Sequence, residues 1–223
     1  MAKAPEQYQG LNGKVGNLIF YTINGVTYVR SAPAKKDKSE KKPSTPAQLH
    51  QQEKLRLTRW FLEPLRQLVY FTHQHGIRGA RTGYHEASGQ IMNHALVHHD
   101  TGLALAPNQI LISSGNLTGP KAPQVGWTED GRVKFTWENN VGAGNAKAKD
   151  QVLVLLYDLE ESMPYYLVEG PPRSAESLLM DVPIPEERRG KLHAYIAFSC
   201  RNSRSKSSLI THNLSNSVYL GTV

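Results

Sequence analysis

The sequence contains few of the features that usually reveal an activity. Its 223 residues include a single cysteine, Cys200, so neither an intramolecular disulfide nor a cysteine-based metal cluster can form within the chain. Cys200 ends the apolar run 194–200, which is typical of a strand residue rather than of a nucleophile. No run of about 18 apolar residues is present, so we expect no insertion into a membrane. The first residues lack the apolar stretch of a secretory signal. This predicts synthesis in a reducing cytoplasm and leaves the final location open, including a place in a particle or an extracellular assembly.

Recognisable catalytic motifs are also missing. There is no Gly-x-Ser-x-Gly nucleophile elbow, and the glycine-rich residues 142–145 lack the Lys-Ser/Thr pair that completes a phosphate-binding loop. We therefore predict that the chain is not an enzyme, with no catalytic residues and no cofactor.

Six histidines between residues 73 and 99 form the one candidate for metal binding. Within this group His94 and His98 have the four-residue spacing of helical zinc ligands. They lack the glutamate of an HExxH motif, and no nearby cysteine or obvious third ligand completes a site, since Asp100 or Glu86 could serve only by a favourable fold. Histidines at a helix C-terminus also interact favourably with the helix dipole, so we predict no metal site. The six are His73, His75, His85, His94, His98 and His99.

The composition is that of a globular protein with an excess of positive charge. Hydrophobic residues make up 39% of the chain and its mean hydropathy is −0.47, which is enough apolar material for a core. The net charge is +7 and the pI is about 9.4. Such a surface favours polyanions, acidic protein surfaces or anionic membranes, without choosing among them.

The N-terminal part predicts an extended arm, a hairpin and a basic linker. Residues 1–12 are polar and contain Pro5 and Gly10. Residues 17–23 and 26–31 are rich in β-branched and aromatic side chains, and Asn24-Gly25 between them is the strongest short signal for a hairpin turn. Residues 34–43 then contain five lysines and two acidic residues. This run is either a solvated linker or a basic arm that docks on phosphate or on an acidic neighbour.

A helical segment follows. Thr45-Pro46-Ala47-Gln48 combines a good N-cap, a proline at the first helical position and the glutamine of a capping box. Apolar residues then recur at helical spacing to about residue 75, and Pro64 should kink or divide this helix near residues 60–64. Residues 82–99 predict a second helix.

From residue 109 the apolar period changes to two. Eight short strands with Gly- and Pro-rich gaps indicate an antiparallel β-sandwich. Trp137 within a strand, and the approach to Tyr195, resemble the corresponding parts of a fibronectin type III or immunoglobulin-like domain without a disulfide. The predicted strands are at about 109–114, 124–128, 131–138, 150–157, 164–168, 175–182, 191–200 and 215–221.

Nearly the whole chain resembles a family of uncharacterised proteins, a domain of unknown function found mostly in Bacteroidota. The resemblance implies a fold but no established activity, substrate or catalytic residue. The segments that carry it are 13–16 (Gly-Lys-Val-Gly), 28–31 (Tyr-Val-Arg-Ser), 45–48 (Thr-Pro-Ala-Gln), 150–152 (Asp-Gln-Val), 193–198 (His-Ala-Tyr-Ile-Ala-Phe) and 215–221 (Ser-Asn-Ser-Val-Tyr-Leu-Gly).

Together these features predict an α+β protein with three parts: residues 1–43 form an arm, hairpin and basic linker, residues 44–108 a helical segment, and residues 109–223 the β-sandwich. An isolated hairpin is marginally stable and needs a surface to lie on. We therefore expect a structural or assembly protein, a component of a virion or a filament, that forms a homo-oligomer or a larger assembly. Its hairpin would engage neighbouring subunits through Phe20, Tyr21 and Tyr28.

The alternative is a nucleic-acid-binding protein, since Lys and Arg beside Ser and Asn are typical of phosphate contacts. A carbohydrate- or surface-binding sandwich is a third possibility that rests on fold analogy alone. The contacts that the alternative predicts, to nucleic acid or an acidic protein surface, lie in two patches, 30–42 and 201–206: Arg30, Lys35, Lys36, Lys38, Lys41, Lys42, Arg201, Arg204 and Lys206.

Overall fold

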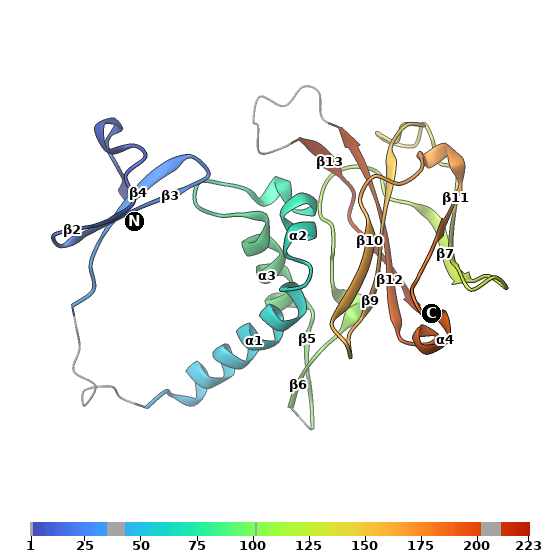
Figure 1. The fold of residues 1–223 in the computed structure, drawn as a ribbon, viewed down its shortest axis with the longest axis horizontal. Coiled ribbons are helices and arrows are strands. Elements are labelled where there is room, and N and C mark those ends of the chain that lie inside the picture. Colours follow the sequence, from blue (N-terminus) through green and yellow to red (C-terminus); the bar gives the residue numbers. More distant parts are fainter. Residues whose placement is uncertain (1, 35–42, 101, 202–210) are drawn as a thin grey trace.

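The computed structural model describes residues 2–34, 43–100, 102–201 and 211–223. Figure 1 shows a small sheet at the N-terminal side, a group of helices beside it, and two further sheets beyond the helices. The predicted α+β class, with an N-terminal hairpin and C-terminal antiparallel sheets, is confirmed. No helix in the described ranges is long and apolar enough to cross a membrane.

The N-terminal sheet contains more than the predicted hairpin. The hairpin consists of β3 (Leu18–Ile23) and β4 (Val26–Ser31), as expected. Two short strands flank it, β1 (Ala2–Lys3) and β2 (Gly13–Val15), so the order is β1-β4-β3-β2. The prediction of a simple extended arm over residues 1–12 was wrong, because side-chain hydrogen bonds described below fold this stretch onto the hairpin.

The first predicted helix is divided into two helices at Pro64. Helix α1 (Pro46–Leu62) starts with the predicted capping box, in which Thr45 and Gln48 bond each other's backbone N–H groups. Pro64 lies in the break before α2 (Arg66–Thr72), as predicted. A single 3₁₀ turn, η3 (Gln74–Gly76), ends this segment.

The second predicted helix is shorter than residues 82–99. Helix α3 spans Gly83–His94, and the chain then forms a hairpin of β5 (Leu96–His99) and β6 (Gly102–Leu105). Gly102 has a φ of +124°, a conformation that glycine adopts easily. The glycine and the β-branched Val97 therefore favour a turn and a strand where the apolar spacing alone suggested helix.

The strand predicted at residues 109–114 is also wrong. A 3₁₀ turn, η4 (Pro107–Gln109), is followed by irregular backbone in which Ile110 and Ile112 are buried, which is why the segment has a strand-like period. Its backbone pairs with no strand among the described residues; side chains and single backbone groups of other segments bond it instead. Leu111 N–H donates to Gln90 Oε1, and Ile112 N–H donates to Ser217 Oγ at 2.9 Å.

The C-terminal part is built of two antiparallel sheets. The smaller sheet has the order β11-β8-β7; in the larger sheet the order is β10-β9-β12-β13, and β14 also pairs with β12. Short helical turns lie at η5 (Arg173–Ala175) and α4 (Pro185–Arg188). The strands are β7 (Lys121–Trp127), β8 (Val133–Glu138), β9 (Gln151–Asp158), β10 (Met163–Leu167), β11 (Ser177–Met180), β12 (Leu192–Arg201), β13 (His212–Leu214) and β14 (Val218–Thr222).

Strands β9 and β12 are buried on both faces and join the layers. One set of their side chains, including Val154 and Ile196, packs toward the smaller sheet around Phe135 and Trp137. The alternate set packs against the helices. In this second cluster Tyr157, Tyr195 and Leu155 meet apolar side chains of α1, α2 and α3. The helices and the larger sheet therefore share one hydrophobic core, which spans the boundary predicted at residue 109 between the helical segment and the β-sandwich.

Tyr195 connects the sheet to the segment before it. Its hydroxyl donates to the carbonyl of Pro107 at 2.9 Å, 88 residues away in sequence. In sequence, the approach to Tyr195 resembles the tyrosine corner of an immunoglobulin-like domain, in which the tyrosine hydroxyl bonds backbone a few residues upstream. The bond to Pro107 is a different contact, so this detail of the prediction was wrong.

Candidate interaction surface on the N-terminal sheet

The two faces of the N-terminal sheet differ in chemistry. Directly opposed residues of antiparallel strands share a face. Phe20 is opposed to Val29, and Val15 to Leu18, so these four residues share one face. Lys14 and Arg30 are opposed to Ile19 on the two sides of it, and so they lie on the other.

The first face is apolar and open to solvent. It surrounds a groove of about 310 Å³ lined by Pro5, Tyr8, Leu11, Val15, Leu18, Phe20 and Val29. None of these lining residues is charged. Tyr8, Leu11, Val15 and Leu18 are 40%, 46%, 65% and 43% exposed, respectively. Large exposed side chains gathered on one face mark an interaction site more often than scattered ones do.

Polar contacts hold the outer wall of the groove in place. Gln9 donates from Nε2 to the carbonyl of Ala4 and accepts from Thr27 N–H through Oε1. Thr27 Oγ1 in turn accepts from Gly10 N–H at 2.8 Å, and Asn12 Oδ1 accepts from Thr22 N–H at 2.8 Å. These bonds fix residues 4–12 across the hairpin, so Tyr8 and Leu11 are presented by an ordered backbone. We call this apolar face, with its groove, the N-terminal groove face.

The opposite face is basic and aromatic. The rings of Tyr21 and Tyr28 are stacked with centroids 5.9 Å apart. Lys3 is opposed to Tyr28, and Lys14 and Arg30 lie on the same side of the sheet. This places three cations around two tyrosines.

The sheet meets the rest of the molecule through the tip of its hairpin. Asn24 and Gly25 have φ values of +51° and +76°, as a two-residue hairpin turn requires. Asn24 Nδ2 donates to the carbonyl of Gly79 at 3.1 Å. The Tyr28 hydroxyl lies so close to Gly79 that a β-carbon there would be 3.1 Å from it. Figure 1 shows the hairpin tip directed at this loop between η3 and α3.

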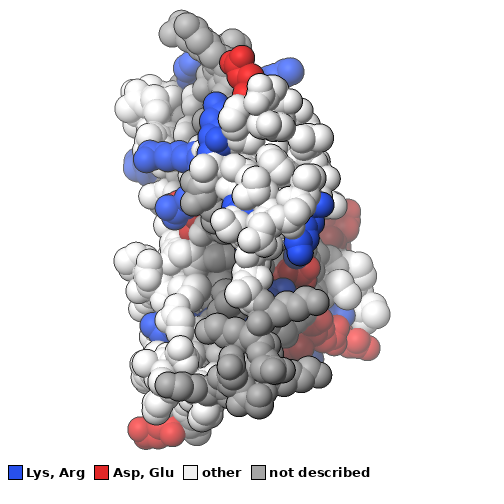
Figure 2. Space-filling model, turned by 90° about the vertical axis from the view of Figure 1, so that its left-hand side faces the viewer, with Lys and Arg blue, Asp and Glu red and all other residues white. Residues whose placement is uncertain are grey.

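Figure 2 shows the side of the molecule on which the sheet lies. Uncharged surface forms much of the upper half, with lysine and arginine side chains beside it and acidic side-chain atoms near its upper edge. On this side of the molecule, charged side chains therefore surround an area of uncharged surface.

The predicted hairpin residues do not form one patch. Tyr21 and Tyr28 are together, but Phe20 points to the groove face, where it is 8% exposed and contacts the Tyr8 ring. Sequence reasoning missed the most exposed members of the groove face: Tyr8, Leu11, Val15 and Leu18. The alternation of Leu18, Phe20 and Thr22 along β3 was a usable signal. Tyr8 and Leu11 had none, because they lie in a stretch expected to be an arm.

Only part of the predicted basic contacts can be placed. Arg30 is exposed on β4 and Arg201 is exposed at the end of β12. The remaining predicted contacts lie outside the described residues: Lys35, Lys36, Lys38, Lys41, Lys42, Arg204 and Lys206.

The histidines do not share one site. His94 ends α3 and His98 lies in β5, so the helical spacing suggested for them does not exist. The His98 ring stacks instead on His50 of α1, with centroids 5.0 Å apart. Within the described ranges no group of three or more His, Cys, Asp or Glu side chains is arranged to hold a metal ion.

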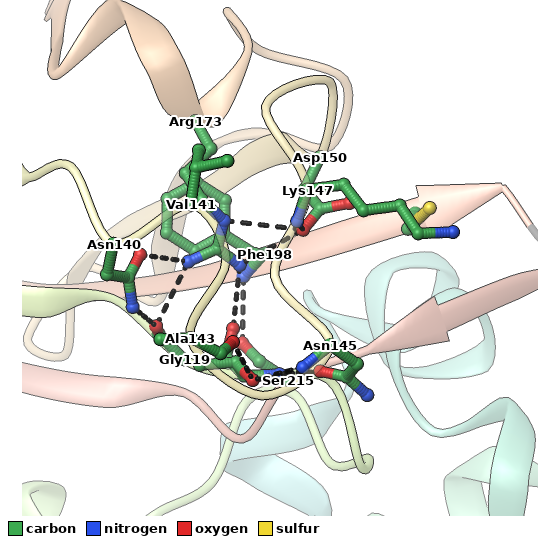
Figure 3. A network of polar contacts seen from close by, with 12 residues as sticks. Gly119, Asn140, Val141, Ala143, Asn145, Lys147, Asp150, Arg173, Phe198 and Ser215 are labelled. Atoms are coloured by element: carbon green, nitrogen blue, oxygen red, sulfur yellow. Dashed lines mark hydrogen bonds and ion pairs between the residues drawn. The ribbon is translucent and has the colours of Figure 1, made fainter.

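A polar network in the C-terminal part of the chain is a buried brace (Figure 3). Arg173 is fully buried, and its guanidinium donates to Asp150, Asn140 and the carbonyls of Gly119 and Thr118. It also lies 3.8 Å from the Phe198 ring centroid. Burial lowers the pKa of Arg173, and Asp150 opposes that shift. Because this group ties three loops together beneath the surface, its role is structural.

Comparison with known proteins gives a family but no activity. The family of unknown function DUF6266 matches residues 10–221. The chain belongs to this family. No curated protein matches it in sequence. The match includes β2, β3 and β4 as well as the C-terminal sheets, so it covers the groove-lining residues from Leu11 onward but not Pro5 or Tyr8.

Proposed function

We propose that this DUF6266 protein is a non-enzymatic assembly protein whose N-terminal groove face docks against the same face of a second copy. The observation that carries the proposal is the open apolar groove of about 310 Å³, bordered by side chains up to 65% exposed. Covering such side chains stabilises a complex by roughly 25 cal/mol for each Å² of apolar surface removed from water.

The charge distribution favours a second copy as the occupant. In a two-fold interface every residue near the axis lies close to its own copy, so any charge there meets a like charge. A chain of net charge +7 can associate with itself most easily through a face that carries none. The groove lining meets this condition, while Lys3, Lys14 and Arg30 lie on the opposite face. An acidic partner would instead require cations in the groove.

The hydrophobic cores of the rest of the molecule form without the N-terminal sheet, and this also supports the proposal. Both large hydrophobic clusters are built from residues 61–223, and neither includes a residue of the N-terminal sheet. The sheet is therefore dispensable for the main cores, and its apolar face is explained by docking.

The C-terminal sheets would form the rigid outer module of the assembly, such as a virion or filament. The strands of the two C-terminal sheets can be numbered 1 to 7 along the chain from β7, if β13 and β14, which both pair with β12, count together as the seventh. In these numbers the smaller sheet has the order 5-2-1 and the larger sheet the order 4-3-6-7. This is the order in fibronectin type III domains, and it supports the resemblance of this part to that fold.

Light scattering with paired variants tests the proposal. Leu18→Lys places a charge in the groove face. Leu179→Lys places the same charge on β11 of the outer module, at a residue that is equally exposed (44% against 43%). We expect a concentration-dependent dimer for the native chain and the Leu179 variant, and at least about tenfold weaker association for the Leu18 variant. A native chain that stays monomeric at high concentration contradicts the proposal.

A nucleic-acid-binding function remains the second candidate because of the opposite face. Aromatic side chains flanked by cations on a sheet surface are typical of single-strand binding. Tyr21 and Tyr28, with Lys3, Lys14 and Arg30 around them, have this arrangement. Arg30 is one of the basic residues predicted to contact nucleic acid, and it shares this face with both tyrosines.

A salt titration distinguishes this candidate. Binding of a single-stranded oligonucleotide should weaken with salt, with a log–log slope of about −0.7 for each neutralised phosphate. Lys14→Gln and Arg30→Gln should each reduce that slope, whereas Lys191→Gln, an exposed lysine on the C-terminal domain, should not. Absence of binding at low salt removes the candidate.

A further inference from the structure

A separate polar cavity lies where the hairpin tip meets the helices. Its volume is about 290 Å³, at the small end of the range for ligand pockets. It is lined by His73, His75, Gly76, Arg78, Arg81, Glu86 and Ser114. The cavity is formed by η3, the loop after it, the start of α3 and the irregular segment near residue 114, and it shares no lining residue with the groove face.

Two arginines are brought to this cavity by one tight turn. Arg78 and Arg81 exchange backbone hydrogen bonds, with Arg78 N–H donating at 3.2 Å and Arg81 N–H at 2.9 Å. Gly79, between them, has a φ of +56°, which glycine tolerates without strain. The geometry of the turn thus holds two guanidinium groups at one opening.

The cavity contains more hydrogen-bond donors than its own acceptors use. Arg81 forms an ion pair with Glu86 at 2.7 Å. The Arg78 guanidinium has no ion pair or hydrogen bond among the described residues. His75 Nε2 is buried from solvent and likewise has no hydrogen-bond partner within the described ranges. A buried polar atom without a partner is costly, so a ligand that accepts hydrogen bonds from Arg78, and from His75 in the tautomer with its proton on Nε2, would stabilise this arrangement.

The charge of the lining indicates the sign of that ligand. Two arginines oppose a single carboxylate, and burial lowers the pKa of His73 to about 4, which keeps it neutral near pH 7. Arginine forks bind tetrahedral oxyanions through paired N–H donors. We propose that this cavity binds a phosphate group, either as the free ion or carried by a larger molecule. This inference goes beyond the assembly function and does not depend on it.

Calorimetric titration of the full chain with inorganic phosphate and with O-phosphoserine, at constant ionic strength, tests the proposal. We expect saturable binding of one equivalent. Equal affinities indicate the free ion as the ligand, and tighter binding of phosphoserine indicates a phosphate carried by a larger molecule.

Three variants locate the binding in this cavity. Arg78→Gln should weaken phosphate binding by about tenfold or more, because a charge-assisted hydrogen bond is lost. Glu86→Gln should strengthen binding several-fold, because it frees Arg81 from its carboxylate. Arg59→Gln removes the same charge from an exposed residue of α1 and should leave binding unchanged. Absence of saturable binding, or equal losses for the Arg78 and Arg59 variants, overturns the proposal.

Discussion

His73 is the single residue whose burial has the most direct consequence in solution. It is 1% exposed, and burial lowers its pKa from the ordinary 6.5 to about 4. Between these values the unfolded chain is protonated at this histidine and the folded chain is not. Protonation of His73 in the unfolded chain therefore favours unfolding below pH 6.5. The free energy of unfolding is highest above pH 6.5 and falls as the pH decreases toward 4.

We predict that the free energy of unfolding decreases from pH 6.5 to pH 4, by up to about 3 kcal/mol from His73. His193 and His212, whose pKa values burial also lowers, act in the same direction. Urea unfolding across this range should show a smaller pH dependence for His73→Gln than for the native chain. His99→Gln, at an exposed site, should retain the native dependence. Equal pH dependence in the two variants contradicts this account of His73.

At the scale of elements, the irregular segment 110–117 depends on the connection between β13 and β14. Ser113 Oγ donates to the carbonyl of Ser215, and Gly115 N–H donates to Asn216 Oδ1. Phe198 N–H donates to Ser215 Oγ, which ties the same connection to β12. The Ser-Asn-Ser run at 215–217 thus braces the irregular segment against β12.

Gly115 is the point of closest approach in this brace. A β-carbon at this position would lie 2.0 Å from the carbonyl oxygen of Leu214. Gly115→Ala should therefore force backbone apart and destabilise the fold by about 3 kcal/mol, the upper end of the usual cost of overpacking. Gly126→Ala on β7 is the matched control, because its β-carbon would have no neighbour within 4 Å. Thermal unfolding measures the melting temperatures of the two variants. Similar values would contradict the prediction, because they would mean that the backbone around Gly115 accommodates the added methyl group without loss of stability.

The sequence predicted local elements better than their mutual arrangement. The capping box at Thr45 and the turn at Asn24-Gly25 follow from adjacent residues, and both were predicted correctly. By contrast, Ile110 and Ile112 alternate like strand residues because both are buried. The backbone of their segment bonds to Gln90 and Ser217, and the latter is over 100 residues away. The continuous apolar run of β9 does signal burial on both faces, but the helical partner was not identified from it. The groove face required the folding of residues 4–12, which depends on long-range side-chain bonds.

At the scale of the whole molecule, the helices and the larger sheet behave as one unit. Leu155, Tyr157 and Tyr195 face the helices and are completely buried. A fragment of residues 109–223 would expose them to water.

We therefore predict that residues 44–223 fold cooperatively, whereas residues 109–223 aggregate or lack a cooperative transition. Circular dichroism during heating, with size-exclusion chromatography of both fragments, measures this. A monomeric, cooperatively folded 109–223 fragment would show that the sandwich does not need its helical cover.

The central claim, that the N-terminal groove face meets the same face of a second copy, is tested most directly by cross-linking between isotopically distinct chains. A photoreactive amino acid replaces Val15, and unlabelled and ¹⁵N-labelled chains are mixed before irradiation. The account predicts cross-linked peptides that contain both isotopes and join residue 15 to residues 5–29 of the other chain. Cross-links that join chains through the C-terminal sheets, or none between chains, would contradict it.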